Sequence, residues 1–557
     1  MPFRLILVFL LLFATSTPVA GERFHQHFTV EADGSYLLEA ELVQHIGSAA
    51  AIGLHAEQFV GFNASLDDVL AIEAWTAKAD GRRVPVASYQ IREQQEAASQ
   101  QAPMFQDTRV KVVIFPAVAV GDTLHLRYRL RRHTPLFPGQ FEHFTAAHRV
   151  PARDMRLSYD LPASMALHAD AVGFEQEPGD SRPGRRRTSW RYVDGGNKRV
   201  EHGSVSHLDY GNRLAVTTFA DYAALALAYS ARAKAAAQPD AAIEQLAADI
   251  VQGILDPHAR AIALSDWVRR NIRYVAVYLG RGGVVPHSAP AVLANRYGDC
   301  KDQAALLQAL LAAAGMPASA ALVNSGTAYR LPLVPTLGVL DHVIVYVPQL
   351  QLYLDPGAAG VAGGLLPPAL LGKPVVLADS GAFAMTPVFQ PARSRTLTRV
   401  DLAPDGSRRF QVTRSSGDAD QHGVIEGFAQ LPGPVALATA FHARDGLIDA
   451  VFKLGQEPRR QLDFVCPAID AQHELRYRLP ANTRVLALPQ ALVVDDGRFF
   501  YRSQYARRGA TVVVKRRLQF RHTAATCTPQ DYRVMRPALV RMMRDLEGQV
   551  LVQVQGR

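Results

Sequence analysis

The sequence has few cysteines and lacks the common short motifs that bind metals, nucleotides or phosphate. Its 557 residues include three cysteines, Cys300, Cys466 and Cys527. It has no Cys-x-x-Cys pair and no His-Glu-x-x-His motif. The Gly-x-x-x-x-Gly-Lys-Ser/Thr phosphate loop, the Gly-x-Ser-x-Gly elbow and a calcium-binding loop are also absent. We therefore expect neither a bound metal nor a cofactor.

Long apolar runs are missing after the start of the chain, because no later stretch reaches the ~18 apolar residues that a membrane-spanning helix needs. The start itself is different: Arg4 precedes the apolar run Leu5–Phe13, and small residues follow up to Gly21. This pattern is typical of a cleavable export signal, with a cut after Ala20 or Gly21. We expect a signal peptide over residues 1–21, a periplasmic or secreted mature protein, and no membrane span after cleavage.

Charge of one sign is not concentrated in the chain. The 60 Lys and Arg residues are opposed by 51 Asp and Glu residues, which gives a net charge of +9. A nucleic-acid-binding protein would gather its basic residues on one face. The densest basic run, from Arg182 to Arg199, is interrupted by Gly, Pro, Ser and Asp. This is typical of a solvated loop or hairpin edge, with a polyanion site as the alternative. We expect no nucleic-acid partner.

Strand-like patterns dominate both ends of the chain. Apolar residues alternate with basic residues and histidine over Leu124–Arg131, and Met155–Leu161 repeats the alternation. A period of two predicts strands with one buried face, so residues 22–239 should form a β-rich, sandwich-like domain. Residues 391–557 return to strand-like runs and end with a helix that opens at Pro529. We expect a second β-rich domain there.

The middle of the chain, residues 240–390, is expected to be an α+β domain. Apolar residues from Ile243 to Ile254 follow helical spacing, and Asp256 and Pro257 then suit the N-cap and first position of another helix. A further helix begins at Cys300 and is followed by strand-like runs at residues 318–323, 342–347 and 351–354. Helices followed by strands indicate an α+β core. The whole chain is thus predicted to be an α+β multidomain protein.

Cys300 stands where a loop becomes a helix, within Tyr297–Asp302. The free N–H groups and partial positive charge of a helix start favour a thiolate over a thiol. Gly298 lets the loop turn tightly and leaves room for a substrate beside the sulfur. The sequence therefore indicates a reactive thiol at Cys300, with a buried packing cysteine as the alternative.

A nucleophilic thiol needs a base and a group that orients the base. His342 lies 42 positions after Cys300 at the start of a predicted strand, and Asp355 lies 13 positions later at the end of the next. Two antiparallel strands joined by a short turn could bring these two side chains together. The alternatives are a structural histidine at His342 and an ordinary turn residue at Asp355, which precedes a proline.

At these positions the chain resembles the transglutaminase-like superfamily of cysteine enzymes, whose fold is papain-like. The resemblance covers roughly residues 240–375. The matching segments are Trp267–Tyr274, Tyr297–Asp302, Ala314–Pro317, Asp341–His342 and Leu354–Pro356. Exported bacterial members carry a β-rich domain of unknown function before this core and a β-rich region after it. The segment Pro286–Pro290 is similar to that subgroup.

The resemblance implies that Cys300 is the nucleophile, His342 is the base and later the acid, and Asp355 orients the imidazole. The backbone N–H of Cys300 is one candidate donor to the oxyanion, and His287 and Tyr297 are side-chain candidates. The implied chemistry is cleavage or transfer at an amide bond through a thioester, on a protein or peptide substrate in the cell envelope. The alternative is a non-catalytic scaffold or interaction protein with the same fold.

The other two cysteines, Cys466 and Cys527, lie in the same predicted domain. An exported protein can form disulfides, and a bond between these two would tie the last helix to the sheet. The alternative is two buried thiols that never meet. Pairing would leave Cys300 as the single free thiol.

Overall fold

The computed structural model describes residues 21–95, 107–147, 152–193, 199–275, 283–358, 361, 363–388, 393–415, 421–425, 434–440, 446–467 and 469–554. Residues 1–20 of the expected signal peptide lie outside these ranges. The sequence also predicts a short strand over residues 274–279, most of which lies outside them as well. The chain separates into two compact units, residues 1–197 with 211–214, and residues 198–210 with 215–557. The division into three domains stays a prediction. In the described part of the chain, no helix is both long and apolar enough to cross a membrane.

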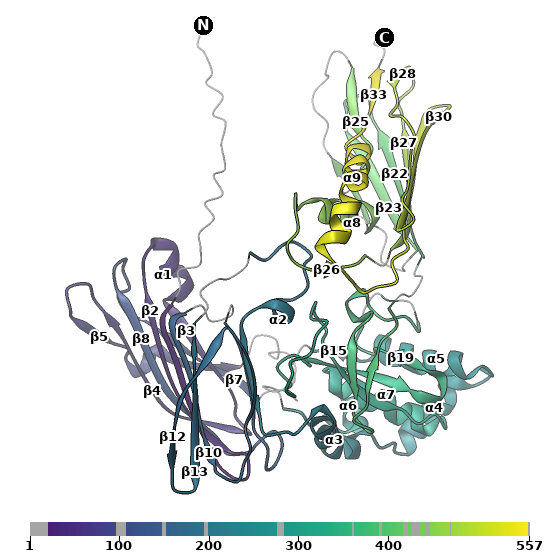
Figure 1. Ribbon diagram of the computed structural model, residues 1–557. Coiled ribbons are helices and arrows are strands. Elements are labelled where there is room, and N and C mark those ends of the chain that lie inside the picture. The colour runs from purple at the N-terminus through teal and green to yellow at the C-terminus, as the bar shows by residue number, and fades with distance from the viewer. Residues whose placement is uncertain are drawn as a thin grey trace. The chain divides into compact units, whose positions relative to one another are not determined.

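The first unit is built around an eight-stranded sheet in the order β12-β13-β10-β1-β2-β8-β4-β5 (Figure 1). Its strands are β1 (Gly21–Val30), β2 (Tyr36–His45), β4 (Asp67–Ala77), β5 (Arg83–Pro85), β8 (Thr123–Arg132), β10 (Ala152–Pro162), β12 (Phe174–Arg182) and β13 (Arg185–Tyr192). In β8, Leu124 and Leu126 are buried while Arg127 and Arg129 are exposed, as the alternation predicted. The basic run near Arg182 forms the β12–β13 hairpin.

A second sheet packs against the first. It contains β3 (Glu57–Asn63), β7 (Thr108–Ile114) and β6 (Ile91–Gln95), and a third small sheet contains β11 (His168–Val172), β14 (Arg213–Thr217) and β9 (Glu142–Ala146). Leu124 and Leu126 of β8 share one apolar core with Val60 of β3 and Val113 of β7. Short helix α1 (Ala49–His55) adds Ala51 to this core. The sandwich-like architecture is confirmed.

The second unit begins with the α+β core. Its elements are α2 (His207–Tyr210), α3 (Tyr222–Ala233), α4 (Ala241–Val251), α5 (Pro257–Asn271), β15 (Arg273–Tyr274), α6 (Ala289–Asn295), β16 (Tyr297–Gly298), α7 (Cys300–Ala313), β17 (Ser319–Val323), β18 (His342–Val347), β19 (Leu352–Leu354), β20 (Pro374–Leu377) and β21 (Phe383–Met385). The sheet order is β19-β18-β17-β20-β21, and α7 packs on β18 and against α4, α5 and α6. Asp256 caps α5 with Pro257 at its first position, as predicted.

The remainder of this unit is β-rich. A seven-stranded sheet contains β24 (Gln421–Ile425), β23 (Arg408–Arg414), β22 (Arg393–Leu402), β27 (Asp470–Arg478), β31 (Thr511–Phe520), β30 (Phe499–Arg508) and β29 (Leu492–Asp495), and a smaller one contains β25 (Val435–Ala438), β33 (Gln549–Val554) and β28 (Thr483–Ala487). Helices α8 (Gly446–Gly455) and α9 (Pro529–Leu546) bury their apolar faces against the large sheet (Figure 1). The helix predicted to open at Pro529 is present, and Pro537 lies inside it.

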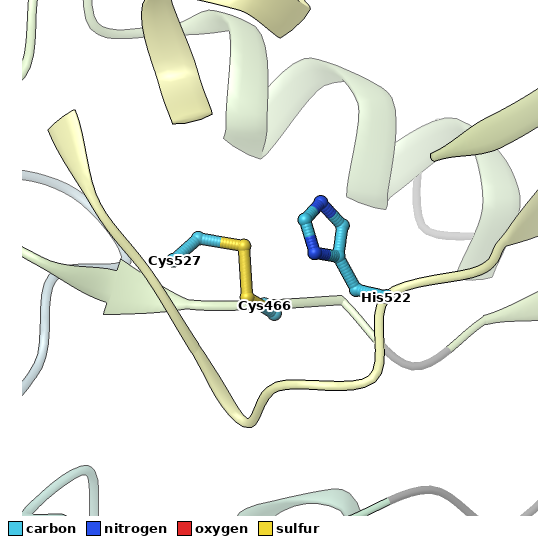
Figure 2. A group of neighbouring side chains, drawn as sticks. All are labelled: Cys466, His522 and Cys527. Atoms are coloured by element: carbon cyan, nitrogen blue, oxygen red, sulfur yellow. A yellow bond between two sulfur atoms is a disulfide. The ribbon is translucent and has the colours of Figure 1, made fainter. Parts of the chain in front are cut away.

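Cys466 and Cys527 form a disulfide, with Cα atoms 5.2 Å apart and sulfurs 1.98 Å apart (Figure 2). It links Cys527 of β32 (Thr526–Cys527) to the residue directly after β26 (Phe464–Val465), and these two short strands pair antiparallel. The ligand atoms of His522 and both cysteines lie within 4.8 Å of one another, but both sulfurs are consumed by the bond. The predicted pairing is confirmed, and the alternative of two separate thiols is wrong.

The segment 199–205 is bound to the chain around β26. The Glu201 carboxylate accepts hydrogen bonds from the backbone N–H groups of Gln461 at 2.6 Å and Leu462 at 3.3 Å. The His202 N–H donates to the Glu457 carboxylate at 3.0 Å, across 255 positions of sequence. This segment therefore belongs to the second unit, although it follows the N-terminal strands directly in sequence.

Candidate active site

Cys300 is the first residue of α7 and is 2% exposed. The helix starts here because Asp299 and Asp302 cap it reciprocally. The Asp299 carboxylate accepts the Asp302 N–H at 3.1 Å, and the Asp302 carboxylate accepts the Asp299 N–H at 3.3 Å. Such a capping box fixes the first turn, and with it the direction of the Cys300 side chain. A Cβ on Gly298 would lie 2.7 Å from the Asp302 Cβ, so the loop can pass here only with a glycine.

Buried charges surround the start of α7. Lys301 and both aspartates of the capping box are completely enclosed, and Lys301 forms an ion pair with Asp299. Burial by itself would lower the pKa of Lys301, but the Asp299 and Asp302 carboxylates raise it. His287 binds Asp302 through Nδ1 at 3.1 Å, and this hydrogen bond raises the pKa of His287. These paired charges stabilise the start of α7.

His342 and Asp355 come from neighbouring antiparallel strands. His342 is the first residue of β18, and Asp355 directly follows β19. The imidazole Nε2 lies 3.2 Å from Asp355 Oδ2, and both side chains are buried. The Gly357 N–H donates to the other carboxylate oxygen at 3.0 Å. The backbone therefore holds Asp355 with one oxygen directed at the imidazole.

His342 also interacts electrostatically with Cys300, so the sulfur, the imidazole and the Asp355 carboxylate lie close to one another. Burial by itself would lower the pKa of His342, but its hydrogen bonds with Asp355 and Cys300 and their negative charges raise it well above its ordinary value. The arrangement can hold an imidazolium beside a thiolate, the pair that nucleophilic cysteine chemistry requires.

Tyr274 is a member of the site that the sequence did not reveal. Strand β15 runs parallel to β16, which places Tyr274 opposite Gly298. Tyr274 interacts electrostatically with Cys300, and its ring faces Gly357, where a Cβ would lie 3.1 Å from the ring. Burial, followed by the negative charges of the site, raises the pKa of this hydroxyl, so Tyr274 acts as a hydrogen-bond donor. Tyr274 is 40% exposed and therefore accessible from solvent.

The two side chains considered as oxyanion donors have other identifiable partners. His287 is bound to Asp302, as described above. The Arg273 guanidinium lies over the Tyr297 ring, 5.3 Å from the ring centroid, in a cation–π contact. Their role at an oxyanion stays a prediction.

The comparisons with known proteins match two separate segments of the chain to family models. Residues 244–326 match the family model described as "Transglutaminase-like superfamily". This range contains Cys300 but ends before His342 and Asp355. Residues 32–195 match the "Domain of Unknown Function with solved-structure structure (DUF3857)". No curated protein matches the chain.

One solved structure shares the fold over nearly the whole chain. It is described as "a putative protease" from Parabacteroides distasonis, with 16% identity, a TM-score of 0.73, and coverage of 96% of this chain and 99% of that one. A "putative cysteine protease" from Cytophaga hutchinsonii has 10% identity over 71% of this chain and 93% of that one. Its TM-score of 0.19 carries no structural argument.

Proposed function

We propose that the transglutaminase-like core is a cysteine enzyme acting on amide or peptide bonds, with Cys300, His342 and Asp355 as its catalytic triad. The observation that supports this proposal is the buried contact of the His342 imidazole with the Asp355 carboxylate at 3.2 Å, together with the interaction of the same imidazole with the Cys300 sulfur. The three residues come from α7, β18 and the end of β19, so three separate elements converge on one point. A purely structural cysteine would not require both partners in this order.

The proposed reaction begins when His342 takes the thiol proton of Cys300. The thiolate attacks the carbonyl carbon of the amide, and the imidazolium then donates its proton to the leaving amine. The product is a thioester on Cys300, which either water or a second amine resolves. Asp355 stabilises the imidazolium throughout. The backbone N–H of Cys300 and the Tyr274 hydroxyl are the donors that we assign to the developing oxyanion.

We propose further that the protein works outside the cytoplasm, on a protein or peptide substrate in the cell envelope. The pattern from Arg4 to Gly21 supports export, and the Cys466–Cys527 disulfide is of a kind that persists in oxidising compartments. Mass spectrometry of protein from an envelope fraction tests this proposal. A mature chain beginning near Glu22 is expected, and a cytoplasmic species that retains Met1 would contradict it.

The catalytic proposal is tested with the full mature chain, an unfolded protein substrate rich in glutamine, and a fluorescent primary amine. Release of peptides or ammonia identifies hydrolysis, and incorporation of the amine identifies acyl transfer. Cys300→Ala should abolish either activity, because loss of the nucleophile removes most of the rate enhancement. If the wild-type protein and Cys300→Ala behave alike in both assays, the core is a scaffold and the proposal is wrong.

A further inference from the structure

Three potential metal ligands lie together at the bond between Cys466 and Cys527. His522 contributes the third, and one ligand atom from each of the three residues lies within 4.8 Å of the other two. Figure 2 shows the imidazole beside the two bonded sulfurs. Among the described residues, no other group of three histidine, cysteine or acidic side chains lies as close together. Two sulfurs and one ring nitrogen are a donor set that zinc and related ions prefer.

The backbone places both cysteines without help from the bond between them. Strands β26 and β32 pair antiparallel, with Phe464 opposite Cys527. The Cys466 N–H donates to the Ala525 carbonyl at 2.9 Å. These backbone hydrogen bonds do not involve the sulfurs, so reduction of the disulfide does not remove them. The two cysteines therefore remain neighbours in the reduced protein.

His522 lies between the end of β31 and the start of β32, and the chain around it is also fixed by the backbone. The Arg521 N–H donates to the Arg498 carbonyl at 2.6 Å. The imidazole is half-buried, and among the described residues its buried Nε2 has no hydrogen-bond partner. The ring interacts electrostatically with the Asp531 carboxylate. A carboxylate close to a histidine ligand is common at metal sites, where it orients the ring.

The spacing of the three donors suits a single thiophilic ion. Tetrahedral zinc lies about 2.3 Å from a thiolate sulfur and about 2.0–2.1 Å from an imidazole nitrogen, so its ligand atoms are about 3.5–3.8 Å apart. The three donors of the cluster already lie within 4.8 Å of one another. The Cα atoms of the two cysteines are 5.2 Å apart, so rotation of their side chains can bring the freed sulfurs to the required distance.

The charge of such a complex also suits its surroundings. Cys466 is 7% exposed and Cys527 is 1% exposed, and both belong to an apolar core that includes Phe464 and Phe520. Two thiolates and a neutral imidazole carry two negative charges, which cancel the two positive charges of Zn²⁺. The complex has no net charge, so it avoids most of the cost of burying an ion.

We propose that Cys466, Cys527 and His522, named here the redox-gated metal site, bind one thiophilic divalent ion such as Zn²⁺ when the disulfide is reduced. Three protein ligands leave the fourth position of the ion to water. The metal replaces the covalent bond as the link between the chain after β26 and the end of β32, so the two segments stay joined in either state. This inference goes beyond the proposed function and does not depend on it.

The reductant that opens the site is a dithiol, the class of compound that reduces disulfides by exchange. One thiolate of the dithiol attacks a cysteine sulfur, the S–S bond breaks, and a mixed disulfide forms. The second thiol of the dithiol then displaces the cysteine from that mixed disulfide. The dithiol is oxidised to its own disulfide, while the two cysteines gain two electrons and two protons. Metal binding releases these two protons, because thiolates are the ligands.

The test uses the full mature chain with the substitution Cys300→Ala, which leaves Cys466 and Cys527 as its cysteines. The protein is reduced with a phosphine and separated from the reductant by gel filtration under argon. Thiol counting measures the reduction, and circular dichroism reports the fold. Zn²⁺ is then titrated in competition with a coloured chelator. Co²⁺ is added to a second sample, because a thiolate–cobalt bond absorbs strongly in the near ultraviolet.

The reduced protein should bind one Zn²⁺ per chain and show thiolate–cobalt absorption, whereas the oxidised protein should do neither. His522→Ala should weaken the binding of Zn²⁺ at least about tenfold, since even the loss of a group that supports a ligand has this effect. The matched control His422→Ala removes an exposed imidazole of the same unit and should retain the parent affinity. Zn²⁺ should raise the melting temperature of the reduced protein and leave that of the oxidised protein unchanged.

Equal affinity in His522→Ala and its parent would overturn the redox-gated metal site, as would reduced protein without thiolate–cobalt absorption. A disulfide that stays closed in the presence of the phosphine would also overturn it. If reduction unfolds the protein, Zn²⁺ should restore the circular dichroism of the folded state, and failure to restore it counts against the proposal. Because the parent lacks Cys300, none of these outcomes bears on the proposed triad.

Discussion

The Asp355→Asn substitution tests how the proposed triad holds its proton. An asparagine keeps the shape of Asp355 and an oxygen that can accept from the imidazole, but it removes the negative charge 3.2 Å from His342 Nε2. A hydrogen bond to a charged partner is worth about 1.5–3 kcal/mol, against about 0.5–1.5 kcal/mol for a neutral one. The imidazolium should therefore lose about 1–1.5 kcal/mol, which lowers the pKa of His342 by about one unit.

The sign of this change can be followed in the alkylation of Cys300 by iodoacetamide. Below the raised pKa of His342, the imidazole is protonated and pairs with the sulfur. Above that pKa the imidazole is neutral, and the thiolate without its cation reacts faster with iodoacetamide than the paired one. In Asp355→Asn, this alkaline rise in the rate should occur about one pH unit lower.

A matched control separates the effect of Asp355 from a general loss of charge. Asp341 directly precedes His342 but binds Ser325, with its carboxylate 2.7 Å from the Ser325 N–H. Asp341→Asn should leave the alkaline rise near its wild-type position. An unchanged profile in Asp355→Asn, or an equal shift in both variants, would refute the reasoning.

Three further changes have defined outcomes. Replacing Cys466 and Cys527 by alanine opens a loop of 61 positions and should lower the free energy of unfolding, measured in urea, by about 4 kcal/mol. Wild-type protein unfolded without reductant should show one free thiol. Tyr274→Phe removes the hydroxyl that interacts with the sulfur, leaves a less stabilised and more nucleophilic thiolate, and should speed its alkylation about twofold at neutral pH; an unchanged rate would show that the hydroxyl does not stabilise it. Lys301→Met leaves Asp299 buried without its cation and should destabilise the fold by about 3–5 kcal/mol in the same denaturation assay, whereas a neutral effect would contradict the buried ion pair.

Local rules were sufficient for the elements that carry the proposed triad. The segment Tyr297–Asp302 predicted a loop that becomes a helix at Cys300, and the structure has α7 starting there. The runs around His342 and Asp355 predicted two short strands, and β18 and β19 pair antiparallel. In each case the signal lies within a few residues, so the sequence alone contains it.

The remainder of the site depends on contacts between distant segments. Tyr274 reaches the sulfur only because β15 pairs in parallel with β16, and a lone tyrosine at the start of a strand carries no mark of that pairing. Four arginines from separate elements, Arg269, Arg270, Arg273 and Arg296, line one cavity because α5, β15 and α6 lie next to one another there. The spacing of residues within any one of these elements does not predict that the three elements lie together. The position of the segment 199–205 cannot be predicted from the sequence either, because its partners lie about 255 positions later in the chain.

That last contact constrains how the chain can fold during synthesis. The segment 199–205 leaves the ribosome long before Glu457 and Gln461 have been made. His202 and its partner Glu457, for example, are 255 positions apart. At about 5–20 residues per second, translation of that interval takes roughly 13–50 s. Throughout this time the segment lacks the hydrogen bonds that later bury it, so it is available to chaperones or to mispairing. The first unit can complete its sheets while it waits, but the second can be finished only when nearly all of the chain has been made.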